Sequence, residues 1–111
     1  MGFRGKYRNR RDANEPLVVE TLEKFGFSVE RLDTPADLLV GHGGMTWLVE
    51  VKQPKGRLNE KQSEFAREWK GHFAVIRSAE EAAEWARSVK DEADTWRQVG
   101  DLARKIVEAQ Q

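Results

Sequence analysis

The segment from residue 36 to residue 52 restricts the fold more than any other part of the sequence. Its two runs, 36–40 (ADLLV) and 45–52 (MTWLVEVK), flank the glycine-rich link Gly41-His42-Gly43-Gly44. Gly-Gly favours a two-residue hairpin turn, and directly opposed residues of a hairpin share one face of the sheet. We therefore expect an antiparallel hairpin with Gly43-Gly44 as its turn, in which Asp37 faces Glu50.

The other elements follow from hydrophobic spacing and from the glycine and proline residues between them. A helix is expected over residues 14–25, with Asn14 a better N-cap than Asp12 because Pro16 follows closely. Residues 27–33 and 72–77 read as strands, whereas 59–70, 78–90 and 92–109 read as helices. The sequence thus predicts an α/β fold in the order α-β-β-β-α-β-α, with a mixed sheet flanked by helices, and a further C-terminal helix.

Length and composition allow one compact domain. The 111 residues, 39% of them apolar, suffice for a single core, and we divide the chain into an arm (1–11), a domain (12–90) and a C-terminal helix (91–111). Without cysteine, and with His42 and His72 isolated, a bound metal is expected on carboxylates. No apolar run approaches the roughly 20 residues that span a bilayer, and no signal peptide is recognisable. We expect a cytoplasmic protein without membrane contact.

Charge is distributed unevenly along a chain whose formal net charge is zero. The first eleven residues contain five basic side chains and no acidic one: Arg4, Lys6, Arg8, Arg10 and Arg11. Such an arm can follow a phosphate backbone and gain affinity by releasing counterions. The alternative is a solvated, frayed terminus with no binding role.

Three side chains of the hairpin form the strongest candidate site. Glu50 and Lys52 point to the same face of their strand, and Asp37 lies opposite Glu50. Two carboxylates at directly opposed positions of a hairpin repel each other. A divalent cation held by both, Mg²⁺ or Mn²⁺, would offset the repulsion. The alternative is an aspartate at a strand start beside a solvated Glu–Lys pair.

Asp37 followed by Glu50-Val51-Lys52 resembles the signature of the PD-(D/E)XK nucleases. A Glu-bearing first helix, GFSVER, PADLLV, a glycine turn, WLVEVK and a Gln-bearing helix are together similar to archaeal-type Holliday-junction resolvases and to small stand-alone VRR-type nucleases. The resemblance covers residues 8–85 and implies a restriction-endonuclease-like core and a bacterial or viral origin. Ala36 separates Pro35 from Asp37, a departure from the family's Pro-Asp pair that leaves the metal ligand in place.

Two further side chains lie on the apolar stripes of their helices. Glu15 shares a stripe with Val18 and Leu22, and the resemblance implies that it is a metal ligand, as is the carbonyl of Val51. Its alternative role is to complement the helix dipole. Gln62 lies on the inward stripe of its helix, where the resemblance implies support of the active site. The alternative for Gln62 is a capping box with Asn59.

These residues suit metal-dependent hydrolysis of phosphodiester bonds in DNA, with Asp37 and Glu50 holding the metal and Lys52 orienting water or neutralising charge. Lys55, Arg57 and Lys61, with the basic arm, would bind flanking phosphates. Since no separate target-recognition module is evident, we expect branched or Holliday-junction DNA as the substrate. The alternatives are a non-cleaving nucleic-acid-binding or adaptor protein and a restriction or repair nuclease.

The C-terminal helix carries Trp96, Val99, Ala103 and Ile106 at the a/d spacing of a coiled coil. Symmetrical cutting of a four-way junction needs two sites related by a two-fold axis, so we expect a homodimer that uses this helix. The alternative is that the stripe packs on its own domain.

Overall fold

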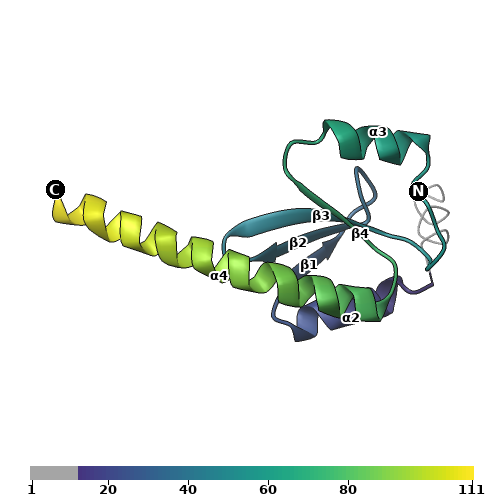
Figure 1. Ribbon diagram of the computed structural model, residues 1–111, viewed down its shortest axis with the longest axis horizontal. Helices are drawn as coiled ribbons and strands as arrows, with labels where there is room; N and C mark the ends of the chain where they lie inside the picture. The colour runs from purple at the N-terminus through teal and green to yellow at the C-terminus, as the bar shows by residue number, and fades with distance from the viewer. Residues whose placement is uncertain (1–12) are drawn as a thin grey trace.

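The computed structural model describes residues 13–111. The expected basic arm, with Arg4, Lys6, Arg8, Arg10 and Arg11, lies outside them. The described chain is a four-stranded sheet with helices on both faces (Figure 1). Its elements are α2 (Glu15–Lys24), β1 (Ser28–Arg31), β2 (Leu38–His42), β3 (Met45–Val51), α3 (Glu60–Glu68), β4 (His72–Ile76) and α4 (Ala79–Ala109). The α/β class is confirmed.

The sheet has the strand order β1-β2-β3-β4 and is mixed. The first three strands form an antiparallel meander that contains the expected hairpin, and β4 pairs parallel to β3 after the α3 crossover. Gly43 and Gly44 both have positive φ, 60° and 84°, as the expected two-residue turn requires. This turn sets the register, and Leu38 pairs with Val49 as the sequence predicts.

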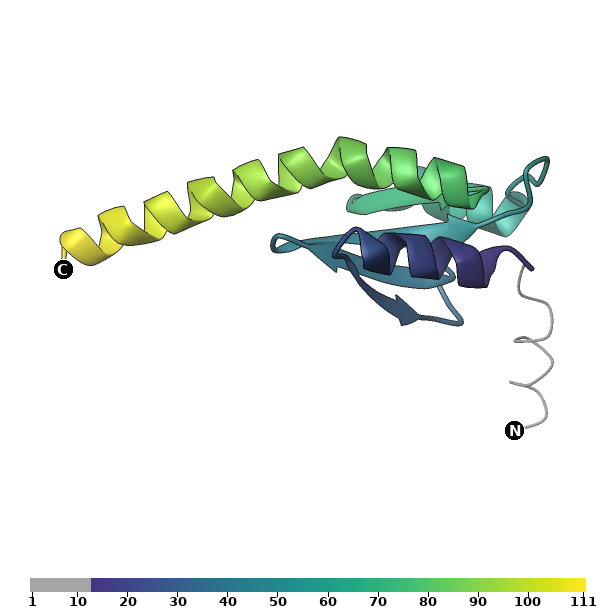
Figure 2. The ribbon, with the colours of Figure 1, turned by 90° about the horizontal axis from the view of Figure 1, so that it is seen from below.

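The two faces of the sheet are covered by different helices. Helices α2 and α4 lie side by side on one face, whereas α3 lies on the other (Figures 1 and 2). The core fills the space between the sheet and the α2/α4 pair, and its members include Leu22, Phe27, Leu38, Trp47, Val49 and Ile76. Because strand residues alternate, the residues between them on β3, Leu48 and Glu50, face α3.

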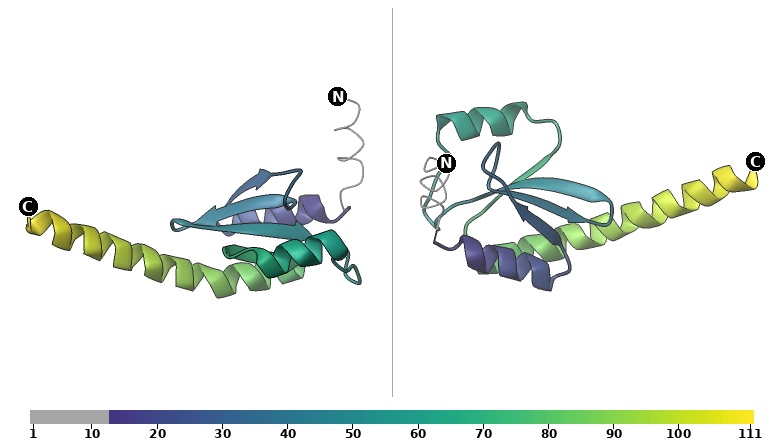
Figure 3. Two further views of the ribbon diagram at one scale, coloured as in Figure 1. Left: turned by 90° about the horizontal axis from the view of Figure 1, so that it is seen from above. Right: turned by 180° about the vertical axis from the view of Figure 1, so that it is seen from behind.

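The expected helix end near residue 90 is wrong, because α4 is one continuous helix of 31 residues. The stretch from Lys90 to Thr95 contains neither proline nor glycine, so nothing in it ends the hydrogen-bond ladder. Only the first half of α4 packs on the sheet, through residues such as Ala82 and Ala86. The second half projects past the sheet, as both views in Figure 3 show. The radius of gyration is accordingly 16.4 Å, against about 13 Å for a compact chain of this length.

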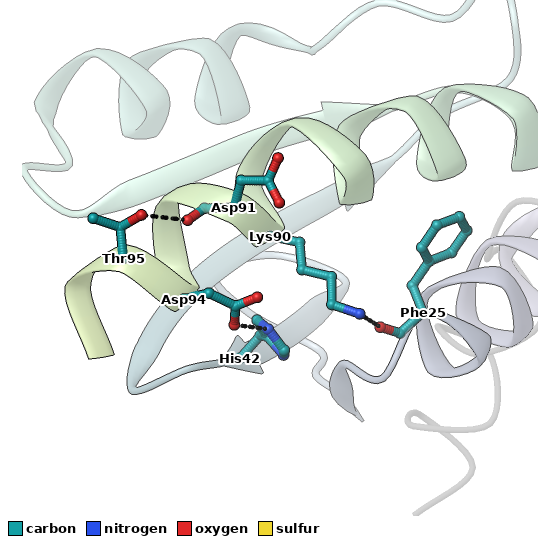
Figure 4. A network of polar contacts seen from close by, with 6 residues as sticks. All are labelled: Phe25, His42, Lys90, Asp91, Asp94 and Thr95. Carbon is teal, nitrogen blue, oxygen red and sulfur yellow. Dashed lines mark hydrogen bonds and ion pairs between the residues drawn. The ribbon is translucent and has the colours of Figure 1, made fainter. Parts of the chain in front are cut away.

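The two histidines have structural contacts. His42 Nε2 lies 3.0 Å from Asp94 Oδ1 on α4, and its ring lies 4.8 Å from that of Phe27. Close by, the Lys90 ammonium donates to the carbonyl of Phe25 (Figure 4). These contacts fix α4 where it leaves the sheet. His72 lies against the ring of Trp47. Within the described chain, no helix combines the length and apolar character needed to cross a membrane.

Candidate active site

Asp37 and Glu50 are brought together by the hairpin register. Asp37 is the next residue outward from the Leu38–Val49 pair, which places it opposite Glu50 on the face that α3 covers. The Asp37 carboxylate is held in place because its Oδ2 accepts a hydrogen bond of 2.8 Å from the backbone N–H of Val51. Two carboxyl groups from neighbouring strands therefore share one site on a rigid sheet.

Glu50 is buried, with only 4% of its surface exposed. Burial, and then the charge of Asp37 and a hydrogen bond with it, raise the pKa of Glu50 from 4.5 to about 8. The nearby Lys52 ammonium opposes this rise but does not cancel it. The fold thus holds a carboxyl group where its charged form is disfavoured unless a further positive charge is present.

Gln62 joins α3 to this carboxyl pair. Its Nε2 donates a hydrogen bond of 2.6 Å to Glu50 Oε2, while its Oε1 accepts one of 2.9 Å from the backbone N–H of Asn59. The Asn59 side chain in turn accepts from the backbone N–H of Gln62, which completes a capping box. One amide group therefore both completes the capping box and contacts Glu50, so the two alternatives that the sequence left open do not exclude each other.

Lys52 directly follows β3, and its backbone is fixed on both sides. Its N–H donates to the carbonyl of Ile76 at 3.0 Å, and its carbonyl accepts from Asn14 Nδ2 at 3.0 Å. The same Asn14 amide donates to the carbonyl of Arg77 at 2.9 Å. Asn14 begins α2 without the side-chain capping bond that the sequence suggested, and instead ties α2 to the ends of β3 and β4. Sequence reasoning found Asn14 but missed this role.

Glu15 is buried as predicted, with 2% of its surface exposed. Its Oε2 accepts a bond of 3.1 Å from Arg31 Nε. Arg31 pairs with Leu38, so both lie on the α2/α4 face, whereas Glu50 faces α3. Among residues 13–111, no three Asp, Glu or His side chains gather as a metal site. Asp37 and Glu50 are the two carboxylates that the hairpin register brings together, and the metal-ligand role expected of Glu15 stays a prediction.

The predicted phosphate-binding residues Lys55, Arg57 and Lys61 are exposed on the connection from β3 to α3 and on the first turn of α3. This connection is fixed to the sheet because Arg77 Nε donates to the carbonyl of Gly56 at 3.1 Å. The three basic side chains therefore follow the strand that bears Glu50 and are open to an incoming polyanion.

Comparisons of the chain with protein-family models, with curated proteins and with solved structures found no match. The site itself is therefore the basis for inferring function. Its donor set fits Mg²⁺ or Mn²⁺, since Mg²⁺ is usually bound by one or two carboxylates, with water and substrate phosphates completing its shell. A zinc site of nitrogen and sulfur ligands does not fit, because the chain has no cysteine.

Proposed function

We propose that the protein is a divalent-metal-dependent nuclease that hydrolyses phosphodiester bonds in DNA. The observation that carries the proposal is the opposed pair Asp37–Glu50, in which the fold holds two carboxyl groups together and raises the pKa of one to about 8. At neutral pH this arrangement costs stability, because the charged form of Glu50 is disfavoured in the folded protein, and a bound divalent cation would offset that cost. The resemblance of Asp37 and Glu50-Val51-Lys52 to the PD-(D/E)XK signature, and with it a restriction-endonuclease-like core, supports the same proposal.

The cation would be held by Asp37, Glu50 and the carbonyl of Val51. The N–H of Val51 points toward Asp37, and the N–H and C=O of one strand residue point to the same edge, so this carbonyl also faces the site. When bound, Mg²⁺ or Mn²⁺ polarises the scissile phosphate and lowers the pKa of a water molecule. The resemblance implies Glu15 as a further ligand; its carboxylate accepts a bond from Arg31 Nε, and its role as a ligand stays a prediction.

Lys52 and Gln62 supply the other functions of the site. The ammonium group of Lys52 is close enough to Glu50 to affect its pKa. There it can orient the attacking water and neutralise charge that develops on the phosphate. Gln62 keeps the Glu50 carboxyl turned toward Asp37 by donating to Oε2, so it is a positioning residue.

Structure-selective cleavage of branched DNA, Holliday junctions among them, is the substrate class that we favour. Lys55, Arg57 and Lys61 are exposed beside the site and suit contacts with phosphates, which give affinity without reading sequence. The described residues form one sheet with its helices and include no separate domain that could read bases. A non-cleaving adaptor protein is the alternative, and the combination of Asp37, Glu50 and Lys52 on one face argues against it.

The test is cleavage of linear, flapped, splayed and four-way DNA, with EDTA, Mg²⁺ or Mn²⁺ added. We expect metal-dependent products with the branched substrates, and a loss of at least about 100-fold in rate for Glu50→Gln and for Lys52→Met. Glu64→Gln is the matched control, because it makes the same chemical change at an exposed position of α3. Full cleavage by Glu50→Gln would refute the site, and binding without cleavage by the wild type would favour the adaptor.

A further inference from the structure

The projecting half of α4 carries a large exposed apolar surface. Trp96, Val99, Leu102, Ile106 and Val107 are each between 49% and 60% exposed. Together with the exposed Ala103 they form what we name the α4 apolar face. Soluble monomers rarely leave such a contiguous surface in water, so it indicates an interaction site.

The apolar and charged residues of this half lie on opposite sides of the helix. With Trp96 and Ala103 at a positions and Val99 and Ile106 at d positions, Leu102 and Val107 fall at the flanking g and e positions. The charged residues are confined to the outer positions b, c and f: Arg97, Asp101, Arg104, Lys105 and Glu108. The e and g positions of this half carry no charged residue that could select a partner of opposite charge. The face is therefore suited to a partner surface that is equally apolar.

This half of α4 has little to stabilise it within its own chain. In the described part of the chain, α4 makes polar contacts with the sheet side through His42–Asp94 and Lys90–Phe25, at the point where the helix departs (Figure 4). Beyond them a groove of about 570 Å³ separates the Gly43-Gly44 turn from the helix near Trp96, Gly100 and Arg104. Isolated helices shorter than about 12–15 residues are marginal in water, and most helical stability in proteins comes from packing of an amphipathic face, so a partner surface would stabilise residues 95–109.

We propose that the partner is a second copy of this chain, whose α4 apolar face packs antiparallel against the first. Half of a large apolar side chain is on the order of 100 Å², so the five large residues bury about 1,000 Å² in total across two copies, the lower bound of a specific interface. Trp96 supplies the aromatic anchor that such small interfaces need. The inference concerns α4 alone and does not rest on the proposed nuclease activity.

The antiparallel direction follows from side-chain size and charge. An antiparallel pair sets Trp96 against Ile106 and Val99 against Ala103 of the other copy, so each layer combines a larger side chain with a smaller one. A parallel pair would set each residue against itself. It would crowd the tryptophans, leave a gap between the alanines, and bring the two copies of Glu92, at the preceding d position, face to face.

The oligomeric state tests the proposal directly. Sedimentation equilibrium of the full chain across the micromolar range should show a reversible monomer–dimer equilibrium. Trp96→Glu with Ile106→Glu should weaken it by about 100-fold or more. Gln98→Glu with Lys105→Gln is the matched control, because it changes the net charge equally on the opposite side of the same helix and should leave the dimer intact. A wild type that remains monomeric, a higher oligomer, or equal loss in the control would overturn the proposal.

A cross-linking experiment tests the direction and avoids charge substitutions in the interface. The chain has no cysteine, so introduced thiols are unique. The antiparallel register brings position 99 beside position 103 of the other copy. An equal mixture of Val99→Cys and Ala103→Cys chains should therefore form a mixed disulfide faster than either chain forms one with itself. Faster self-linking of Val99→Cys would establish a parallel pair and overturn the antiparallel arrangement.

Discussion

Glu50 links the chemistry of the site to the stability of the fold. Its pKa is raised to about 8 in the native protein, chiefly by burial and secondly by Asp37, so without metal the native state favours the protonated form. The stabilising contribution of Glu50 is therefore fully present when the pH is below its unfolded pKa near 4.5. It is lost as the pH rises through about 8.

We predict that the metal-free protein loses a few kcal/mol of unfolding free energy between about pH 5 and about pH 9. Glu50→Gln, which keeps a neutral group in this place, should lose much less over the same range and should be more stable than the wild type at the alkaline end. Urea denaturation in EDTA measures both curves, with Glu64→Gln as the exposed control. Parallel curves for the wild type and Glu50→Gln would contradict the assignment.

Asn14 makes its hydrogen bonds with residues that are distant in the sequence and that only the fold brings close to it. Its amide donates to Lys52 and Arg77, which are 38 and 63 positions away. Asn14→Asp keeps the shape but removes both donors and sets a carboxylate against two carbonyls. We predict a loss of about 2–4 kcal/mol in unfolding free energy and slower cleavage, because Lys52 is no longer fixed.

Asn14→Ser, which retains one donor, should fall between Asn14→Asp and the wild type in both measurements. Thr21→Ser is the control on the same helix, since it keeps the hydroxyl that donates to the carbonyl of Leu17. If Asn14→Asp were as stable and as active as the wild type, Asn14 would not be the clamp described above.

At the scale of the element, α3 contributes both a helix start and a side chain of the site. Asn59→Ala removes the cap only, whereas Gln62→Ala removes its part of the capping box and the bond to Glu50. Both should destabilise α3 by about 1 kcal/mol. Only Gln62→Ala should alter the metal concentration needed for half-maximal cleavage, because only Gln62 contacts a proposed ligand.

Equal changes in metal requirement for Gln62→Ala and Asn59→Ala would reduce Gln62 to a capping residue. Hydrogen exchange of the α3 amides is the second measurement, since it reports loss of the cap without depending on activity. Both variants should increase exchange in the first turn of α3 by similar factors.

The elements differ in how far sequence could predict them, for a physical reason in each case. The hairpin was predictable because Gly43-Gly44 is a local signal that fixes the register, and the register places Asp37 opposite Glu50. The continuity of α4 was not predictable from the sequence. No residue there ends a helix, but the absence of a helix-breaking residue is only weak evidence that the helix continues. The burial of Glu15 was predictable from its place on the inward stripe of its helix, but its bond with Arg31 was not, because the stripe does not say which strand residue lies opposite.

For the whole molecule, metal binding and folding should be linked. A cation that binds only the native state raises its stability by mass action, and binding must release the proton that Glu50 holds below about pH 8. We predict that Mn²⁺ raises the melting temperature of the wild type, with a larger increase at about pH 8 than at about pH 6. Asp37→Asn and Glu50→Gln should lose most of the increase, whereas Glu64→Gln should retain it.

Calorimetric titration in buffers of different ionisation enthalpy would count the protons released. A stabilising effect of the metal that survives both site variants would place the cation elsewhere on the molecule.

The parallel pairing of β4 with β3 also has a consequence for how the chain folds. The β2–β3 hairpin closes through two residues and can form in microseconds, whereas β4 reaches β3 only after the α3 crossover, a slower and less local closure. Until then one edge of β3 is unpaired, and this strand is almost wholly apolar apart from Thr46 and Glu50. Such an edge is a template for pairing with another chain. Substitutions that weaken β4 should therefore reduce the yield of refolding through aggregation before they measurably affect the folded site.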